Sequence, residues 1–283
     1  MSVAGGLITT AELARRIATA DDLVVLDVRS GPNGAGRAQF EAGHIPGARH
    51  TDYAADGWRA KIGGAPGMLP DAAHLSGLFG RLGLAPETPV VIVPAGQSAN
   101  DCAAAARIFW TLQVCGYTPL ALLDGGMPAW IAEGRALQAG PAPTFSGVAP
   151  IHLQPGLRAS AAETLAAVTG RSATLIDGRA GSYFRGEEKA GEALVAGHIP
   201  GALSIDYVQA YDAAANRIRP QAELATLYAA VPDGAAVISY CNTGHTAALN
   251  WFALAHVLGR RNIRLYDGSM TDWTQDPARP VAR

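Results

Sequence analysis

Three short motifs occur twice along this chain of 283 residues, and they keep the same order each time. The hexapeptide Gly-His-Ile-Pro-Gly-Ala stands at residues 43–48 and returns letter for letter at residues 197–202. An apolar run that ends in Asp-x-Arg occupies residues 23–29 and 173–179, and an Asp-Gly-Gly or Asp-Gly-Ser motif followed by Trp occupies residues 124–130 and 267–273. Chance could supply one of these matches, but three in one order indicate a tandem duplication. The chain is therefore predicted to fold as two similar domains.

A linker is predicted between the two copies. Residues 138–150 are rich in Pro, Gly and small side chains, a composition that disfavours helices and central strands and suits an extended connection. The first domain is accordingly placed at residues 1–140 and the second at residues 150–283.

Within each copy, short apolar runs alternate with helical stretches. In the second copy a helix is expected over residues 159–169, because Ser160 and Glu163 have the spacing of a capping box. Strands are expected at residues 173–177 and 236–240, and a second helix over residues 247–258 ends at Gly259. Nearly continuous apolar strands that alternate with helices indicate a mainly parallel sheet flanked by helices on both faces, an α/β fold.

Composition narrows the classes of function. A formal net charge of -2 and scattered basic residues argue against a dedicated nucleic-acid-binding protein. No apolar run approaches the roughly 18 residues that span a bilayer, and residues 1–10 lack the basic and apolar segments of a signal peptide. The chain has 3 cysteines without CxxC or Cys/His spacing, so neither a disulfide framework nor a structural metal site is expected. These features favour a cytoplasmic protein with free thiols.

Cys241 is the candidate nucleophile. It follows the predicted strand 236–240 directly, and ligands of parallel α/β folds bind at the carboxyl ends of strands. The next residues are small or polar and run into a helix, so backbone N–H groups and the helix N-terminus can favour the thiolate form of Cys241. Gly244 permits a positive φ where this loop bends. The alternative is that Cys241 is a small buried residue, which is the interpretation we give to Cys102 and Cys115 on the predicted helix 101–115.

The duplicated motifs, together with a Cys that opens a polar loop before a helix, resemble the tandem-domain rhodanese sulfurtransferases, which include thiosulfate and 3-mercaptopyruvate sulfurtransferases. Met68-Leu69-Pro70 also resembles the first domain of these enzymes. The resemblance implies that Cys241 takes a sulfur atom from an anionic donor and holds it as a persulfide until a thiol, cyanide or sulfite removes it. It also implies that the reaction needs no metal or organic cofactor. The implied active-site loop consists of the residues that follow Cys241, namely Asn242, Thr243, Gly244, His245 and Thr246.

The first copy has no thiol at the matching place. Its strand over residues 89–94 is followed by Ala95, and the loop after it is expected to be longer than the loop after Cys241. Without a thiol this copy cannot hold a persulfide, and the resemblance likewise implies an inactive first domain.

Arg185 and His245 are the candidate donor-binding residues. Arg185 falls near the place of a donor-binding Arg in the family, in a register that differs by two residues, and it could instead pair with Glu187 or Glu188. His245 could supply a hydrogen bond or a partial charge to the donor, or could face outward. We favour thiosulfate because His245 can provide the cation that Asn242 does not, while the hydroxyl of Thr243 keeps 3-mercaptopyruvate as an alternative.

Supporting roles are expected for the other repeated polar residues. The Asp-x-Arg pairs, Asp27 with Arg29 and Asp177 with Arg179, are expected to bind neighbouring loops, and this structural role is favoured over contact with the substrate. The histidines of the repeated hexapeptide, His44 and His198, are expected to hold their turns. The resemblance leaves a second role open for His44, which could face the cleft near the active-site loop.

Two other classes of function use a similar scaffold. Phosphatases related to rhodanese need Cys-x5-Arg so that the Arg can clamp the phosphoryl group, and the required position here is Ala247. A sulfur-relay or binding module that works with a protein partner remains an alternative. A monomer is expected, because the duplication already supplies both domains.

Overall fold

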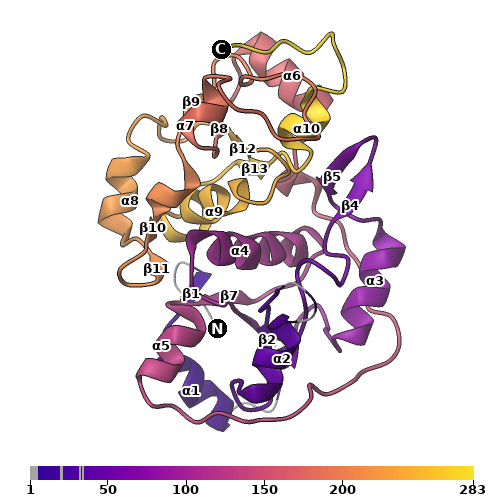
Figure 1. The fold of residues 1–283 in the computed structure, drawn as a ribbon, viewed down its shortest axis with the longest axis vertical. Helices are drawn as coiled ribbons and strands as arrows, with labels where there is room; N and C mark the ends of the chain where they lie inside the picture. Colours follow the sequence, from indigo (N-terminus) through magenta and orange to yellow (C-terminus); the bar gives the residue numbers. More distant parts are fainter. Residues whose placement is uncertain (1–5, 20–21, 32, 34) are drawn as a thin grey trace. The chain divides into compact units, whose positions relative to one another are not determined.

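The computed structural model describes residues 6–19, 22–31, 33 and 35–283. Residues 1–5, which form half of the N-terminal stretch considered above, lie outside the described residues. The chain divides into two compact units (Figure 1). Unit 1 consists of Met1–Trp58, Pro70–Gln154 and Asp212–Ile218, and unit 2 consists of Arg59–Leu69, Pro155–Tyr211 and Arg219–Arg283.

Unit 1 is built on a parallel sheet with the strand order β1-β7-β6-β2-β3. The strands, in that order, are Leu7–Ile8, Leu120–Leu123, Val90–Val93, Val24–Asp27 and Arg49–His50. The helices are α1 (Thr10–Thr19), α2 (Ala35–Ala42), α3 (Ala72–Arg81), α4 (Ala99–Val114) and α5 (Gly126–Ala132).

Unit 2 repeats this arrangement with the parallel order β13-β12-β8-β9. These strands are Ile263–Leu265, Val237–Tyr240, Thr174–Asp177 and Leu203–Ser204. Arg158 forms a parallel bridge to Leu265, in the place where β1 pairs with β7 in unit 1. The two sheets therefore confirm both the duplication and the predicted fold class.

The helices of the second half include the two that the sequence predicts. They are α6 (Ala161–Gly170), α7 (Gly181–Phe184), α8 (Gln221–Leu227), α9 (Ala247–Phe252) and α10 (Ser269–Trp273), with 3-10 turns at Pro155–Leu157 and Tyr207–Ala210. Ser160 and Glu163 form the predicted capping box at the start of α6. The helix predicted over residues 247–258 is α9 followed by a π turn at Ala253–Val257, and Gly259 has a φ of 64° just beyond it.

Both faces of each central strand are buried, as a parallel sheet between helices requires. In unit 2 one face carries a core that includes Leu175, Ile238 and Tyr240 together with Met270 and Trp273 of α10. On the other side, α9 contacts β12 and β13. This packing fixes the carboxyl end of β12 firmly between its neighbours.

Each copy also contains a short hairpin that belongs to the other compact unit. In the first copy β4 (Ala60–Ile62) pairs antiparallel with β5 (Ala65–Met68), and this hairpin is part of unit 2. In the second copy β10 (Tyr211–Asp212) pairs with β11 (Arg217–Ile218), and residues 212–218 are part of unit 1. The chain crosses from one unit to the other once more between Gln154 and Pro155, just beyond the predicted linker. Residues 139–150 form neither helix nor strand, as expected for that linker.

No helix among the described residues is long and apolar enough to cross a membrane.

Candidate active site

Cys241 lies where β12 ends, and it opens the loop of residues 241–246 that leads into α9. β12 is an inner strand between β13 and β8, so this end of the sheet is held from both sides. The Cys241 residue is only 2% exposed. The thiol therefore occupies the predicted strand end, in a largely desolvated position.

The first residues of α10 hold the start of the loop along one side, which we call its outer side. The backbone N–H of Cys241 donates to the hydroxyl oxygen of Ser269 at 3.0 Å. The N–H of Met270 donates to the carbonyl oxygen of Cys241 at 3.1 Å, and the N–H of Thr271 donates to that of Asn242 at 3.0 Å. The first two carbonyl groups of the loop are thus turned toward α10.

The opposite side of the loop presents N–H groups. The amide N–H groups of Asn242, Thr243 and Thr246 donate to no atom of the described residues. Gly244 has a φ of 68°, as predicted, which lets the loop turn back toward α9. Unpaired N–H groups at a strand end, followed by a helix, are an arrangement that can bind an anion.

A buried ion pair supports the loop from the neighbouring strand. Arg179 binds both carboxylate oxygens of Asp177, with its shortest contact at 2.6 Å, and donates to the carbonyl of Gly197 at 2.8 Å. Its other terminal nitrogen lies 3.5 Å from the side-chain oxygen of Asn242. Burial alone lowers the pKa of Arg179, but its hydrogen bonds and charge interaction with Asp177, with smaller contributions from Tyr240 and Cys241, raise it above the ordinary value. A permanent positive charge therefore stands beside the loop.

The first copy contains the same ion pair without a thiol near it in sequence. Arg29 binds Asp27 at 2.7 Å and donates to the carbonyl of Gly43 at 2.8 Å. In both copies the Arg thus ties a strand end to the repeated hexapeptide, as expected for a structural pair.

The histidines of the hexapeptide hold their turns. The Nδ1–H of His44 donates to the carbonyl oxygen of Phe40 at 2.8 Å, and the ring of His44 stacks on that of Phe40 at 3.8 Å. His198 makes the same pair of contacts with Phe184, at 2.8 Å and 3.6 Å. The expected supporting role of both residues is confirmed.

The two candidate donor-binding residues lie in different settings. Arg185 follows α7, its side chain is 60% exposed, and it forms a two-pronged ion pair with Glu187 at 2.6 and 2.8 Å. The pairing that the sequence offered as an alternative for Arg185 is therefore present. His245 is half-buried within the loop itself, directly after Gly244.

The other two cysteines lie in core positions. Cys102 is on α4 and Cys115 caps its C-terminus, and both are buried. Burial raises the pKa of each thiol to about 12, which keeps both protonated at neutral pH.

The expectation of a longer loop in the first copy is wrong. β6 ends at Val93 and α4 begins at Ala99, whereas β12 ends at Tyr240 and α9 begins at Ala247, so the loop that contains Ala95 is the shorter one. The side chain of Ser98 accepts a hydrogen bond from the N–H of Asp101 and starts the helix early.

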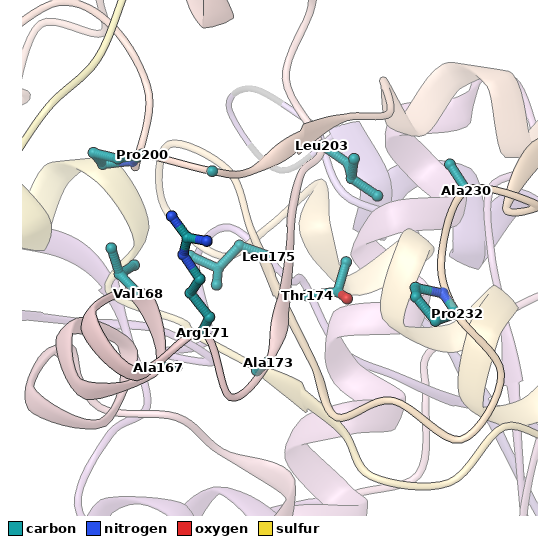
Figure 2. A pocket seen from close by; sticks show the side chains of 11 residues that line it. Ala167, Val168, Arg171, Ala173, Thr174, Leu175, Pro200, Leu203, Ala230 and Pro232 are labelled. Carbon is teal, nitrogen blue, oxygen red and sulfur yellow. The ribbon is translucent and has the colours of Figure 1, made fainter.

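A separate cavity of about 530 Å³ lies elsewhere in unit 2 and does not include Cys241. It opens beside Thr174, where β8 begins, rather than at the carboxyl ends of the strands. Figure 2 shows the Arg171 side chain extending toward Pro200, with Leu203 and Pro232 on another wall.

The described residues contain no group of three or more His, Cys, Asp or Glu side chains arranged to hold a metal ion.

Sequence reasoning missed Ser269 as a part of this site. A signal for Ser269 was present in the repeated Asp-Gly-Gly/Ser motif. The two copies differ at its third residue, which is Gly126 in the first copy and Ser269 in the copy that contains Cys241. Both residues have a positive φ, 54° and 49°, a conformation that costs a serine energy and a glycine almost none.

Comparisons with known proteins show the family to which the chain belongs. The model of the rhodanese-like domain matches residues 9–133 and 160–276. The chain is 33% identical to a thiosulfate sulfurtransferase of Pseudomonas aeruginosa over 97% of its length and 96% of that protein. It is 35% identical to a "Probable 3-mercaptopyruvate sulfurtransferase" of the same organism, over 98% and 97% of the two chains. The crystal structure of SseA from Escherichia coli, a 3-mercaptopyruvate sulfotransferase, has the same fold with a TM-score of 0.80 and 24% identity, covering 93% of this chain and 98% of that one. The chain therefore belongs to the rhodanese family and carries two rhodanese-like domains in tandem.

Proposed function

We propose that this protein is a sulfurtransferase that moves the outer sulfur atom of thiosulfate to a thiophilic acceptor through a persulfide on Cys241. The observation that carries the proposal is the loop after Cys241, whose first carbonyl groups are bound on the outer side while the N–H groups of Asn242, Thr243 and Thr246 have no partner among the described residues. Such an arrangement stabilises negative charge on sulfur without a metal or organic cofactor.

The proposed reaction has two displacement steps. The Cys241 thiolate attacks the outer sulfur of thiosulfate, the bond between the two sulfur atoms of the donor breaks, and sulfite leaves with the electron pair. The product is a Cys241 persulfide with one negative charge on its outer sulfur. Cyanide then attacks that sulfur, thiocyanate leaves, and the Cys241 thiolate is restored. A thiol or sulfite acceptor would react in the same way.

Thiosulfate is the proposed donor because its sulfonate group requires hydrogen-bond donors and positive charge. His245 on the loop and Arg185 after α7 are the side chains proposed to supply them, and Arg179 adds a fixed charge beside Asn242. The relative named as a 3-mercaptopyruvate sulfurtransferase supports that keto acid as the second candidate donor. Relay of the sulfur to a protein thiol is a further candidate for the acceptor step.

In this proposal the two copies of the repeat have different roles. Residues 150–283 would carry the chemistry, and residues 1–140 would form an inactive rhodanese-like domain. We propose a monomer that acts in the cytoplasm on small molecules, without nucleic acid or membrane as partner. The three free cysteines of the described chain support a reducing compartment.

Formation of thiocyanate from thiosulfate and cyanide tests the proposal. Wild type and Cys102→Ala should both form thiocyanate, whereas Cys241→Ser should form none above the uncatalysed rate. A parallel assay with 3-mercaptopyruvate compares the two donors. If wild type uses neither donor, the proposed sulfurtransferase activity is refuted.

A further inference from the structure

We infer that the hairpin β4–β5 positions the active-site loop of unit 2, and that Gly67 is the residue through which it does so. The inference rests on the proposed function of Cys241 and extends it to a residue far away in the sequence. Hairpin and loop both belong to unit 2, although the hairpin comes from the first copy of the repeat.

The hairpin is anchored beside the loop by a buried carboxylate. The N–H of Leu69 donates to Oδ2 of Asp267 at 2.6 Å, and Arg158 donates to Oδ1 of the same residue at 2.9 Å. Asp267 is 1% exposed, so a carboxylate in this place needs hydrogen-bond and charge partners, and Leu69 and Arg158 are two of them. Asp267 stands two residues before Ser269, which accepts the N–H of Cys241. One short segment therefore holds both the end of the hairpin and the start of the loop.

Gly67 leaves no room for a side chain against the loop. A Cβ atom at this position would lie 1.8 Å from the carbonyl oxygen of Thr243 and 2.6 Å from its carbonyl carbon. Both neighbouring atoms belong to the backbone, so no change of rotamer can relieve the overlap. Either the hairpin or the loop would have to move.

The position of the Thr243 carbonyl matters because a peptide group is planar and trans. When a carbonyl oxygen points to one side of the chain, the N–H of the next residue points to the other side. The carbonyls of Cys241 and Asn242 are bound by α10, and these bonds turn the next two N–H groups the opposite way. The carbonyl of Thr243 instead lies against Gly67. The hairpin thus fixes the third peptide group of the loop, as α10 fixes the first two.

A substitution at Gly67 should therefore disturb sulfur chemistry far more than it disturbs folding. The test compares Gly67→Ala with Gly191→Ala in the full-length protein. Gly191 also belongs to unit 2, has no positive φ, and has open space around its Cβ position. The measurements are the rate of sulfur loading from thiosulfate by mass spectrometry, the rate of Cys241 alkylation by iodoacetamide from acidic to basic pH, and the thermal unfolding midpoint.

For Gly67→Ala we expect a cooperative unfolding transition, a loading rate reduced by about 100-fold, as displacements of roughly 1 Å can cause, and an alkylation profile shifted to higher pH. Gly191→Ala should load sulfur and react with iodoacetamide like wild type. The inference is overturned if Gly67→Ala folds and matches Gly191→Ala in both reactions. If Gly67→Ala does not fold, the same measurements on Asp267→Asn test the inference, since this variant weakens the anchor at Leu69 without adding an atom near the loop. Slower loading with a shifted alkylation profile supports the inference, and wild-type behaviour contradicts it.

The alkylation measurement separates this inference from the proposed function. If wild type does not load sulfur from any donor, the proposed function fails, but a difference in alkylation between the two glycine variants would still establish that Gly67 positions Cys241.

Discussion

The hydroxyl oxygen of Ser269 accepts a hydrogen bond from the backbone N–H of Cys241 at 3.0 Å, and the same hydroxyl donates to the carbonyl of Tyr266 at 2.8 Å. Ser269 is fully buried and has a φ of 49°. A glycine would fit this backbone without strain, as Gly126 does in the first copy. The contact with Cys241 gives the serine a role that the glycine cannot fill.

We predict that Ser269→Ala and Ser269→Gly both slow sulfur loading, because each leaves the N–H of Cys241 without its acceptor. Ser269→Ala should lower the free energy of unfolding by about 1–3 kcal/mol, the cost of an unsatisfied buried donor. Ser269→Gly should lower the free energy of unfolding by roughly 1 kcal/mol less than Ser269→Ala does, because glycine removes the backbone strain at this position. Denaturant unfolding and single-turnover loading measure the two effects. Equal loading rates in wild type and both variants would show that the hydroxyl does not position Cys241.

The two buried ion pairs offer a matched comparison. Arg179→Lys and Arg29→Lys should each lower the free energy of unfolding by about 2 kcal/mol, because lysine cannot reproduce the paired hydrogen bonds to the aspartate. Only Arg179→Lys removes a contact with Asn242. It should therefore also slow sulfur loading by about tenfold, or about 1.4 kcal/mol of activation free energy. Equal effects of the two variants on loading would contradict a role of Arg179 at the site.

His256 should make the stability of the protein depend on pH. Burial lowers its pKa to about 4, and its ring stacks on Phe252. Because the unfolded chain binds the proton more readily, this contribution is fully present above about pH 6.5 and is lost as the pH falls toward 4. At pH 5 the loss should be about 2 kcal/mol.

The variant His256→Phe keeps a ring and removes the titration. Its unfolding free energy should fall less than that of wild type between pH 7 and pH 5, measured by denaturant titration at each pH. An equal decrease in the two proteins would assign the pH dependence to other groups.

Arg185→Ala tests the proposed donor-binding role of that residue. The ion pair with Glu187 is exposed on both sides and contributes little to stability, so the unfolding midpoint should not change. If Arg185 binds the donor, KM for thiosulfate should rise several-fold while KM for cyanide stays the same. Glu187→Gln, which frees the guanidinium, serves as the opposite control. An unchanged KM for thiosulfate in Arg185→Ala would restrict Arg185 to its surface pair.

Local sequence signals predicted much of the fold and the place of Cys241 at the end of a strand. The strand before Cys241, the positive φ of Gly244 and the capping box of Ser160 each depend on residues that are neighbours in the chain. Their physical causes can therefore be identified directly in the sequence.

The features that sequence analysis missed depend on residues brought together by folding. Gly67 meets Thr243, and Leu69 meets Asp267, across large separations in the chain. The repeated motifs keep the same order in each copy, and nothing in them indicates that a hairpin of each copy belongs to the other compact unit. The early start of α4 is local, but it depends on a single cap at Ser98 that was not recognised.

The most direct test of the central role of Cys241 is to locate the transferred sulfur. Wild-type protein is treated with thiosulfate, digested, and analysed by mass spectrometry under conditions that preserve persulfides. We predict one added sulfur atom on the peptide that contains Cys241, lost on addition of cyanide, and none on the peptides that contain Cys102 or Cys115. Added sulfur on either of those buried cysteines, or none on Cys241, would contradict the proposed mechanism.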